Sequence, residues 1–128
     1  MSTPIGPYAP IVRAGPWLIC SGQLGLRPGT EGRASPATLV DGGAPAQLTQ
    51  ALANADRLLR DNGATPADVV KTTVFVTDMD GYAAVNAAYA AFFADHRPAR
   101  SVVGVAGLPM GAVVEVEVWA YVDPPPAQ

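Results

Sequence analysis

The spacing of hydrophobic residues predicts two helices. Between residues 44 and 62, apolar side chains recur at steps of three and four residues, and polar residues such as Gln47 and Asn54 fall between them. This spacing is typical of an amphipathic helix, and Asn62 followed by Gly63 is a typical helix end. A second helix is predicted from Asp80, which we expect to cap it, to Phe93. Its apolar face consists of Tyr82, Val85, Tyr89, Phe92 and Phe93, which we expect to pack in a core or an interface.

Short apolar runs predict the strands. Residues 68–77 alternate between apolar and polar and are rich in valine, threonine and phenylalanine, which favour strands. Similar runs predict strands at residues 17–26, 100–106 and 112–122, and Val12 lies in a further strand that precedes a turn. Residues 27–43 carry prolines and glycines without periodicity, which predicts a long loop. We expect the last two strands to pair as a hairpin.

The order of these elements predicts the fold class. Strand, strand, helix, strand, helix, strand, strand is typical of an α+β fold, with two helices packed on one face of a mixed β-sheet. A length of 128 residues suits one domain, which we expect to span residues 1–128.

The last predicted strand indicates that the second sheet face is also covered. Successive side chains of a strand point to opposite sides, so Val114, Val116, Val118 and Val122 share the side that faces the helices. The other side mixes apolar residues with carboxylates, and it consists of Val113, Glu115, Glu117, Trp119 and Tyr121. Burial of this face against sister subunits, with binding sites in the seams, explains both properties.

Composition supports self-association and excludes several classes of partner. Hydrophobic residues make up 49% of the chain and charged residues 15%, so a monomer has little polar surface. The net charge of -3 argues against a nucleic-acid partner, because the chain has no basic stripe. Neither a secretory signal nor a run of ~20 apolar residues is present, so we expect a cytoplasmic protein without a membrane partner. One cysteine and one histidine cannot form a metal-ligand cluster.

Charged residues within predicted strands point to a binding site. Arg100 begins one strand and Glu115 and Glu117 lie inside another, where a charge is costly unless it is paired or used. An arginine binds a carboxylate through two parallel hydrogen bonds, and a nearby glutamate can act as a base or hold a water. From these residues alone, structural ion pairs are the simpler explanation, and Lys71 or Arg13 could pair with Glu117.

Five segments resemble the Rid family of enamine and imine deaminases, also called the YjgF family. They are Ile5–Tyr8, Ser21–Gln23, Val70–Val76, Val85–Phe93 and Pro98–Ser101. They occur in order, at compatible spacing, over nearly the whole chain. The resemblance implies a chorismate-mutase-like fold and a homotrimer with clefts between its subunits. It also implies hydrolysis of imines and enamines such as 2-aminoacrylate to 2-keto acids and ammonia, without a metal or cofactor.

The resemblance also implies roles for individual residues. Arg100 corresponds to the arginine that binds the substrate carboxylate, and Glu115 to the glutamate that positions the attacking water. Further substrate-binding positions are Tyr8, Ser21, Asn86 and Val102. Many family members have a cysteine where this chain has Val102, and because the chemistry needs no thiol, we expect the change to affect the pocket shape and the substrate range.

Several functions stay open at this stage. The chain could be a broad imine deaminase, a deaminase specialised for one catabolic or biosynthetic imine, or a non-catalytic module that binds a 2-keto acid and regulates a partner. Ribonuclease activity, attributed to some relatives, is a poorer candidate because the chain is acidic and lacks a histidine pair. We expect His96 to be solvated without a role, and Cys20 to point away from Ser21, toward the core.

Overall fold

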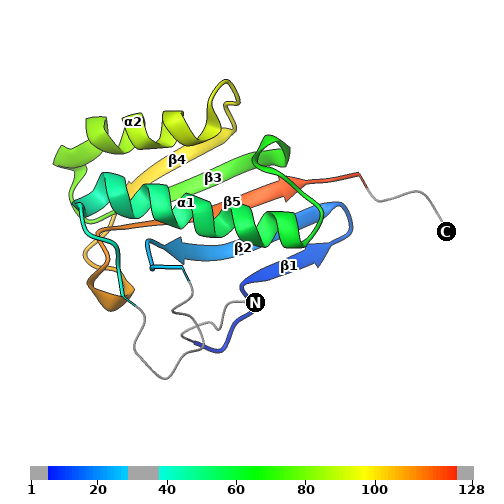
Figure 1. The fold of residues 1–128 in the computed structure, drawn as a ribbon, viewed down its shortest axis with the longest axis horizontal. Coiled ribbons are helices and arrows are strands. Elements are labelled where there is room, and N and C mark those ends of the chain that lie inside the picture. Colours follow the sequence, from blue (N-terminus) through cyan, green and yellow to red (C-terminus); the bar gives the residue numbers. More distant parts are fainter. Residues whose placement is uncertain (1–5, 29–37, 124–128) are drawn as a thin grey trace.

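The predicted order of strands and helices is present in the computed structural model, which describes residues 6–28 and 38–123 (Figure 1). Residues 29–37, in the middle of the predicted loop, lie outside the described part. The strands are β1 (Ile11–Ala14), β2 (Trp17–Leu24), β3 (Val69–Val76), β4 (Ala99–Gly104) and β5 (Val114–Tyr121). The α-helices are α1 (Gly43–Asp61) and α2 (Tyr82–Phe93), and both lie on one face of the sheet.

The strands form a mixed sheet in the order β1-β2-β5-β3-β4. Strands β3 and β4 are parallel, and the other neighbours are antiparallel. The predicted hairpin of the last two strands is therefore wrong, because β5 lies between β2 and β3 while β4 lies at the edge. Helix α2 returns the chain to the starting end of β3, so that β4 runs parallel to it. The segment after β4 then crosses β3 to reach the centre of the sheet.

The core lies between the sheet and the helices. Val114, Val116 and Val118 of β5 are fully buried there, together with leucines of α1 and Val85 of α2, so the predicted inward face of the last strand is confirmed. Complete burial of such a side chain contributes roughly 1.5–3 kcal/mol to folding. On the opposite face, Trp119 is 39% exposed and Tyr121 is 43% exposed. A single chain thus leaves one face of its sheet uncovered.

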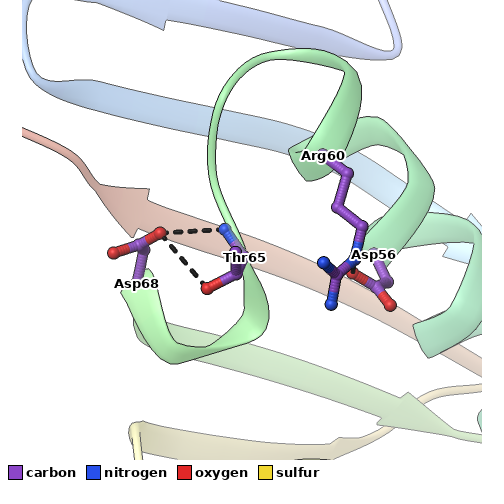
Figure 2. Close-up of polar contacts among 4 residues, drawn as sticks. All are labelled: Asp56, Arg60, Thr65 and Asp68. Carbon is purple, nitrogen blue, oxygen red and sulfur yellow. Dashed lines mark hydrogen bonds and ion pairs between the residues drawn. The ribbon is translucent and has the colours of Figure 1, made fainter. Parts of the chain in front are cut away.

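The end of α1 agrees with the prediction. Asn62 closes the helix, and Gly63 has a φ of +84°, which a glycine adopts without strain. Figure 2 shows the polar contacts on either side of this end: Arg60 Nε donates to Asp56 Oδ1 at 2.7 Å, and the backbone nitrogen of Thr65 donates to Asp68 Oδ2 at 2.8 Å. The second contact is part of a capping box that begins a 3-10 helix and leads into β3.

The start of α2 differs from the prediction. Asp80 does not cap this helix, which begins at Tyr82 after Gly81. Asp80 instead lies in a preceding 3-10 turn, where its backbone nitrogen donates to the side chain of Asp78 at 2.9 Å. The carboxylate of Asp78 therefore caps this short turn, and α2 begins after it without a side-chain cap.

The prediction of a solvated His96 is also wrong. Its ring is partly buried, with Nε2 2.7 Å from the carbonyl oxygen of Val69 and its edge against Phe93. This contact joins the segment after α2 to the start of β3, which gives the histidine a structural role.

Candidate functional site

A pocket of about 400 Å³ opens on the uncovered face of the sheet. Its walls come from the N-terminal segment, β2, β5 and the turn before β5. The lining residues are Tyr8, Ser21, Gly22, Pro109, Glu115 and Glu117. The structure therefore brings together three residues predicted for the site, namely Tyr8, Ser21 and Glu115.

Ser21 connects the N-terminal wall of the pocket to the sheet. Its Oγ donates to the carbonyl oxygen of Ala9 at 2.6 Å, and its backbone nitrogen donates to that of Pro10 at 2.9 Å. Both contacts hold the segment that carries Tyr8 against β2. A register shift between Cys20 and Gln23 occurs at the same place, and such irregularities re-aim side chains beside functional sites. Ser21 thus shapes the pocket through the backbone.

Gly22 makes room for the carboxylate of Glu115. A Cβ atom at this position would lie 2.5 Å from Glu115 Oε2 and 2.7 Å from its Cδ. Because real Cβ atoms do not approach other atoms so closely, any side chain here would displace the carboxylate. The sequence-based prediction gave this glycine no role in the site, although it lies within a segment that resembles the family.

Two buried polar residues of α1 hold the strand ends beside the pocket. Asn54 Nδ2 donates to the carbonyl oxygens of Leu24 and Leu26, both at 3.1 Å, and Gln47 Oε1 accepts from the backbone nitrogen of Val113 at 3.0 Å. Sequence spacing placed Asn54 and Gln47 off the apolar face, yet both are buried. They satisfy backbone groups where β2 ends and β5 begins, which explains polar side chains at buried positions.

The two carboxylates of the pocket lie on the same side of β5. Burial raises the pKa of Glu115 above its ordinary value, and the negative charge of Glu117 raises this pKa further. The predicted ion pairs of Glu117 are wrong, because Lys71 Nζ donates to Ser101 Oγ at 2.9 Å and Arg13 Nη2 donates to the carbonyl oxygen of Asn62 at 2.9 Å. Within the described residues, this acidic pair has no cationic partner.

Arg100 lies on the other side of the sheet, beneath α2. It is opposite Thr72 in β3, and Thr72 is fully buried on the helix side. The guanidinium lies over the rings of Tyr82 and Tyr89, with Cζ 5.7 Å and 4.8 Å from their centroids. Arg100 Nη2 donates to Tyr82 Oη at 3.1 Å, and the hydroxyls of Tyr89 and Thr72 share a hydrogen bond of 2.8 Å.

Consequently, one chain does not bring Arg100 and Glu115 together. They point to opposite faces, and β3 separates their strands, which places the two strands about 10 Å apart. Asn86 and Val102 are on the same side as Arg100. Val102 packs against the core, and Asn86 Oδ1 is buried without a hydrogen-bond partner in the described part of the chain. The predicted site residues thus form two groups, the acidic pocket and the Arg100 group.

Cys20 takes no part in either group. It is buried in the core as predicted, and this burial raises the pKa of its thiol to about 12. The thiol is therefore protonated at neutral pH and cannot act as a nucleophile.

Comparison with known proteins identifies the family. The model of the family described as Endoribonuclease L-PSP matches residues 1–122 of the chain. The chain belongs to this family. Its members include proteins named YjgF, RutC and RidA, so the Rid resemblance of the sequence is confirmed.

Two relatives and one solved structure are similar to this chain over most of its length. A 2-iminobutanoate/2-iminopropanoate deaminase of Salmonella typhimurium is 41% identical over 119 residues, which are 91% of this chain and 88% of that protein. A RutC family protein of Pyrococcus horikoshii is 36% identical over 118 residues, which are 92% of this chain and 89% of that protein. The structure of RidA from a Psychrobacter species matches with a TM-score of 0.85 and 35% identity, over 94% of this chain and 93% of the other. The α+β fold is therefore shared with the family.

The described residues contain neither a helix that is long and apolar enough to cross a membrane nor a group of three or more metal-ligating side chains.

Proposed function

We propose that this Rid protein hydrolyses small 2-imino acids to 2-keto acids and ammonia. Relatives at about 40% identity are named 2-iminobutanoate/2-iminopropanoate deaminases, which supports this substrate class. The observation that carries the proposal is the division of the site into an acidic pocket on one face of the sheet and a guanidinium on the other. These are the two groups that a 2-imino acid needs, one near its imine carbon and one at its carboxylate.

The proposed active site lies between two copies of the chain. Each copy offers both groups on different surfaces, so that Arg100 of one copy can face the acidic pocket of the next. Contacts of this head-to-tail type form a ring when the rotation between successive copies closes. We propose a homotrimer, the assembly implied by the family resemblance, in which the exposed aromatic face around Trp119 and Tyr121 is covered.

In the proposed mechanism, Arg100 binds the substrate carboxylate through paired, charge-assisted hydrogen bonds. Glu115 holds a water and accepts one of its protons as the oxygen attacks the imine carbon, which converts the C=N bond into a single bond. Glu115 returns this proton to the nitrogen, which gives a neutral carbinolamine. A second proton passes from the hydroxyl through Glu115 to the nitrogen as the C–N bond breaks, so that ammonia leaves and the oxygen becomes the keto group. An enamine first tautomerises to the imine. Water and imine thus balance keto acid and ammonia.

The raised pKa of Glu115 suits this role. A base is most effective when its pKa lies near the working pH, and general-base assistance is typically worth ~10²- to 10⁴-fold in rate. Burial and Glu117 both move the pKa of Glu115 upward, toward that range. Glu117 thereby adjusts the base without pairing with it.

A coupled assay tests the activity. An amino-acid oxidase generates the imine, semicarbazide traps what remains, and the wild type is compared with Arg100→Ala and Glu115→Gln. We expect only the wild type to reduce semicarbazone formation. If no imine is consumed across several side chains, but 2-ketobutyrate binds tightly, the chain is a binding module; consumption of a single imine would indicate a specialised deaminase.

Mixing the two inactive variants tests the shared site. If each site combines Arg100 of one chain with Glu115 of another, a mixture exchanged at equal concentrations regains about a quarter of the wild-type activity, because half of the chains supply each intact group. If the site lay within one chain, the mixture would stay inactive.

The word endoribonuclease in the family description raises a second possibility. The pocket presents two carboxylates, which repel a phosphate backbone, and the whole chain carries a net charge of -3. We therefore expect no RNA cleavage by the pure protein. Cleavage that persists in Arg100→Ala would favour a nuclease over the deaminase.

A further inference from the structure

The hydroxyl of Tyr82 lies beside Arg100 and retains an unused hydrogen-bond donor. Arg100 Nη2 donates to Tyr82 Oη at 3.1 Å, so the phenol oxygen acts as the acceptor in this contact. A phenol also has one O–H group to donate. No acceptor for it lies among the residues that the structure describes, and Tyr82 is 40% exposed. The donor is therefore accessible to a ligand that approaches Arg100.

The guanidinium has a second support besides this hydroxyl. The ring of Tyr89 lies closer to Arg100 than that of Tyr82, at 4.8 Å against 5.7 Å from Cζ to the centroids. Tyr89 is itself buried and hydrogen-bonded to Thr72. Removal of the Tyr82 hydroxyl alone leaves both rings and the positive charge in place.

We propose that the O–H of Tyr82 donates a second hydrogen bond to the carboxylate that Arg100 binds, and that Tyr82 thereby determines specificity for anionic substrates. The inference rests on the proposed function, in which Arg100 binds that carboxylate. Arg100 has five N–H donors in a planar fork, of which one hydrogen points to Tyr82. A carboxylate at the remaining donors lies next to the phenol, and its oxygens accept from both residues.

This arrangement distinguishes acids from their amides. A carboxylate offers acceptor oxygens on both sides, and hydrogen bonds to such an ion are about twice as strong as neutral ones. A carboxamide replaces one oxygen with an NH₂ group, which cannot accept from either Arg100 or Tyr82. The tyrosine therefore favours 2-imino and 2-keto acids over neutral analogues.

The test compares Tyr82→Phe with Tyr121→Phe in the full chain. Both changes remove one phenol hydroxyl and keep the ring of a partly exposed tyrosine, but Tyr121 lies on the opposite face of its own sheet from Arg100. The measurements are kcat and KM for an imino acid, and inhibition constants for 2-ketobutyrate and its neutral amide. For Tyr82→Phe we expect KM and the 2-ketobutyrate constant to rise about 10-fold, the loss typical of one hydrogen bond to a charged group. We expect a kcat within about 2-fold and a clearly smaller rise in the amide constant. For Tyr121→Phe, on the face that the proposed trimer covers, we expect the ratio of the 2-ketobutyrate and amide constants to stay at its wild-type value.

The outcomes separate this inference from the proposed function. If Tyr82→Phe leaves KM and the 2-ketobutyrate constant unchanged while Arg100→Ala loses binding, the proposed role of Tyr82 is overturned. The proposed function is then unaffected. An equal rise for the acid and the amide would also overturn it and show a structural role. If the wild type hydrolyses no imine but binds 2-ketobutyrate in a Tyr82-dependent way, the hydrolase proposal fails and this one holds. If the wild type binds no carboxylate, both fail.

Discussion

The acidic pocket and the Arg100 group hold their charges in opposite ways. In the pocket, Glu115 is half-buried beside Glu117, and its pKa is raised. Beneath α2, Arg100 lies over two aromatic rings and keeps its charge, since a guanidinium does not lose its proton in proteins. The pocket thus brings the pKa of a carboxylate closer to neutral pH, as a general base requires. The Arg100 group keeps a permanent charge in a defined orientation, as the binding of an anion requires.

Replacement of Arg100 tests this difference most severely. We expect Arg100→Ala to lower kcat/KM by about 10³-fold, comparable to the largest losses on removal of a preorganised hydrogen-bond donor in other enzymes. Arg100→Lys retains the charge but loses the planar fork, and we expect it to recover only part of this loss. The assay is imine hydrolysis, with circular dichroism to verify folding. Full activity in Arg100→Ala would remove this residue from the site.

A methyl group at Gly22 tests how closely the pocket holds Glu115, the proposed base. Because the added Cβ would overlap the carboxylate of Glu115, we expect Gly22→Ala to lower kcat about 10- to 100-fold, the usual effect of a displacement near 1 Å. Gly107→Ala is a matched control, since a Cβ there meets nothing within 4 Å. Equal activities of the two variants would show that the position of Glu115 does not matter.

We expect the contacts that hold Tyr89 beneath Arg100 to contribute to the stability of the fold. Thr72→Val removes the partner of the Tyr89 hydroxyl and leaves that hydroxyl buried, which costs about 1–3 kcal/mol of unfolding free energy. Urea denaturation measures this change. The double variant with Tyr89→Phe should recover part of the loss, because no unpaired hydroxyl then remains; an additive loss would contradict this account.

The smallest expected effect is a shift of the pH profile. If ionised Glu115 is the base, kcat/KM falls as the pH decreases through its raised pKa. Glu117→Gln removes a neighbouring negative charge, lowers the pKa of Glu115 and should move this acid limb to lower pH. An unmoved limb would show that Glu117 does not influence the base.

The same raised pKa has a consequence for stability. Between the unfolded and folded pKa values, the native state binds more protons than the unfolded state, so the free energy of unfolding decreases as the pH rises. Glu115→Gln should therefore be more stable than the wild type above the folded pKa. This advantage should disappear at acidic pH. Thermal unfolding of both proteins, measured once above and once below the folded pKa, would show this.

Much of the fold was predictable because its signals are local. The alternation of Val114, Val116 and Val118 identified the buried side of β5, and the spacing within α1 identified that helix and its end at Asn62. Asn54 and Gln47 were misplaced because their partners are backbone groups of distant strands. The role of Gly22 was not predicted for a similar reason, since the close approach that requires a glycine involves a side chain from another strand.

The sequence alone specifies which residues carry charge, which side of each strand is apolar, and where the helices end, since these properties depend on residues a few positions apart. The family resemblance adds the expectation that Arg100 and Glu115 belong to the substrate site. Strand order is different, because pairing joins segments that are far apart in the chain. It was the position of β4 at the sheet edge, parallel to β3, that placed Arg100 against Tyr82 and Tyr89 and away from Glu115.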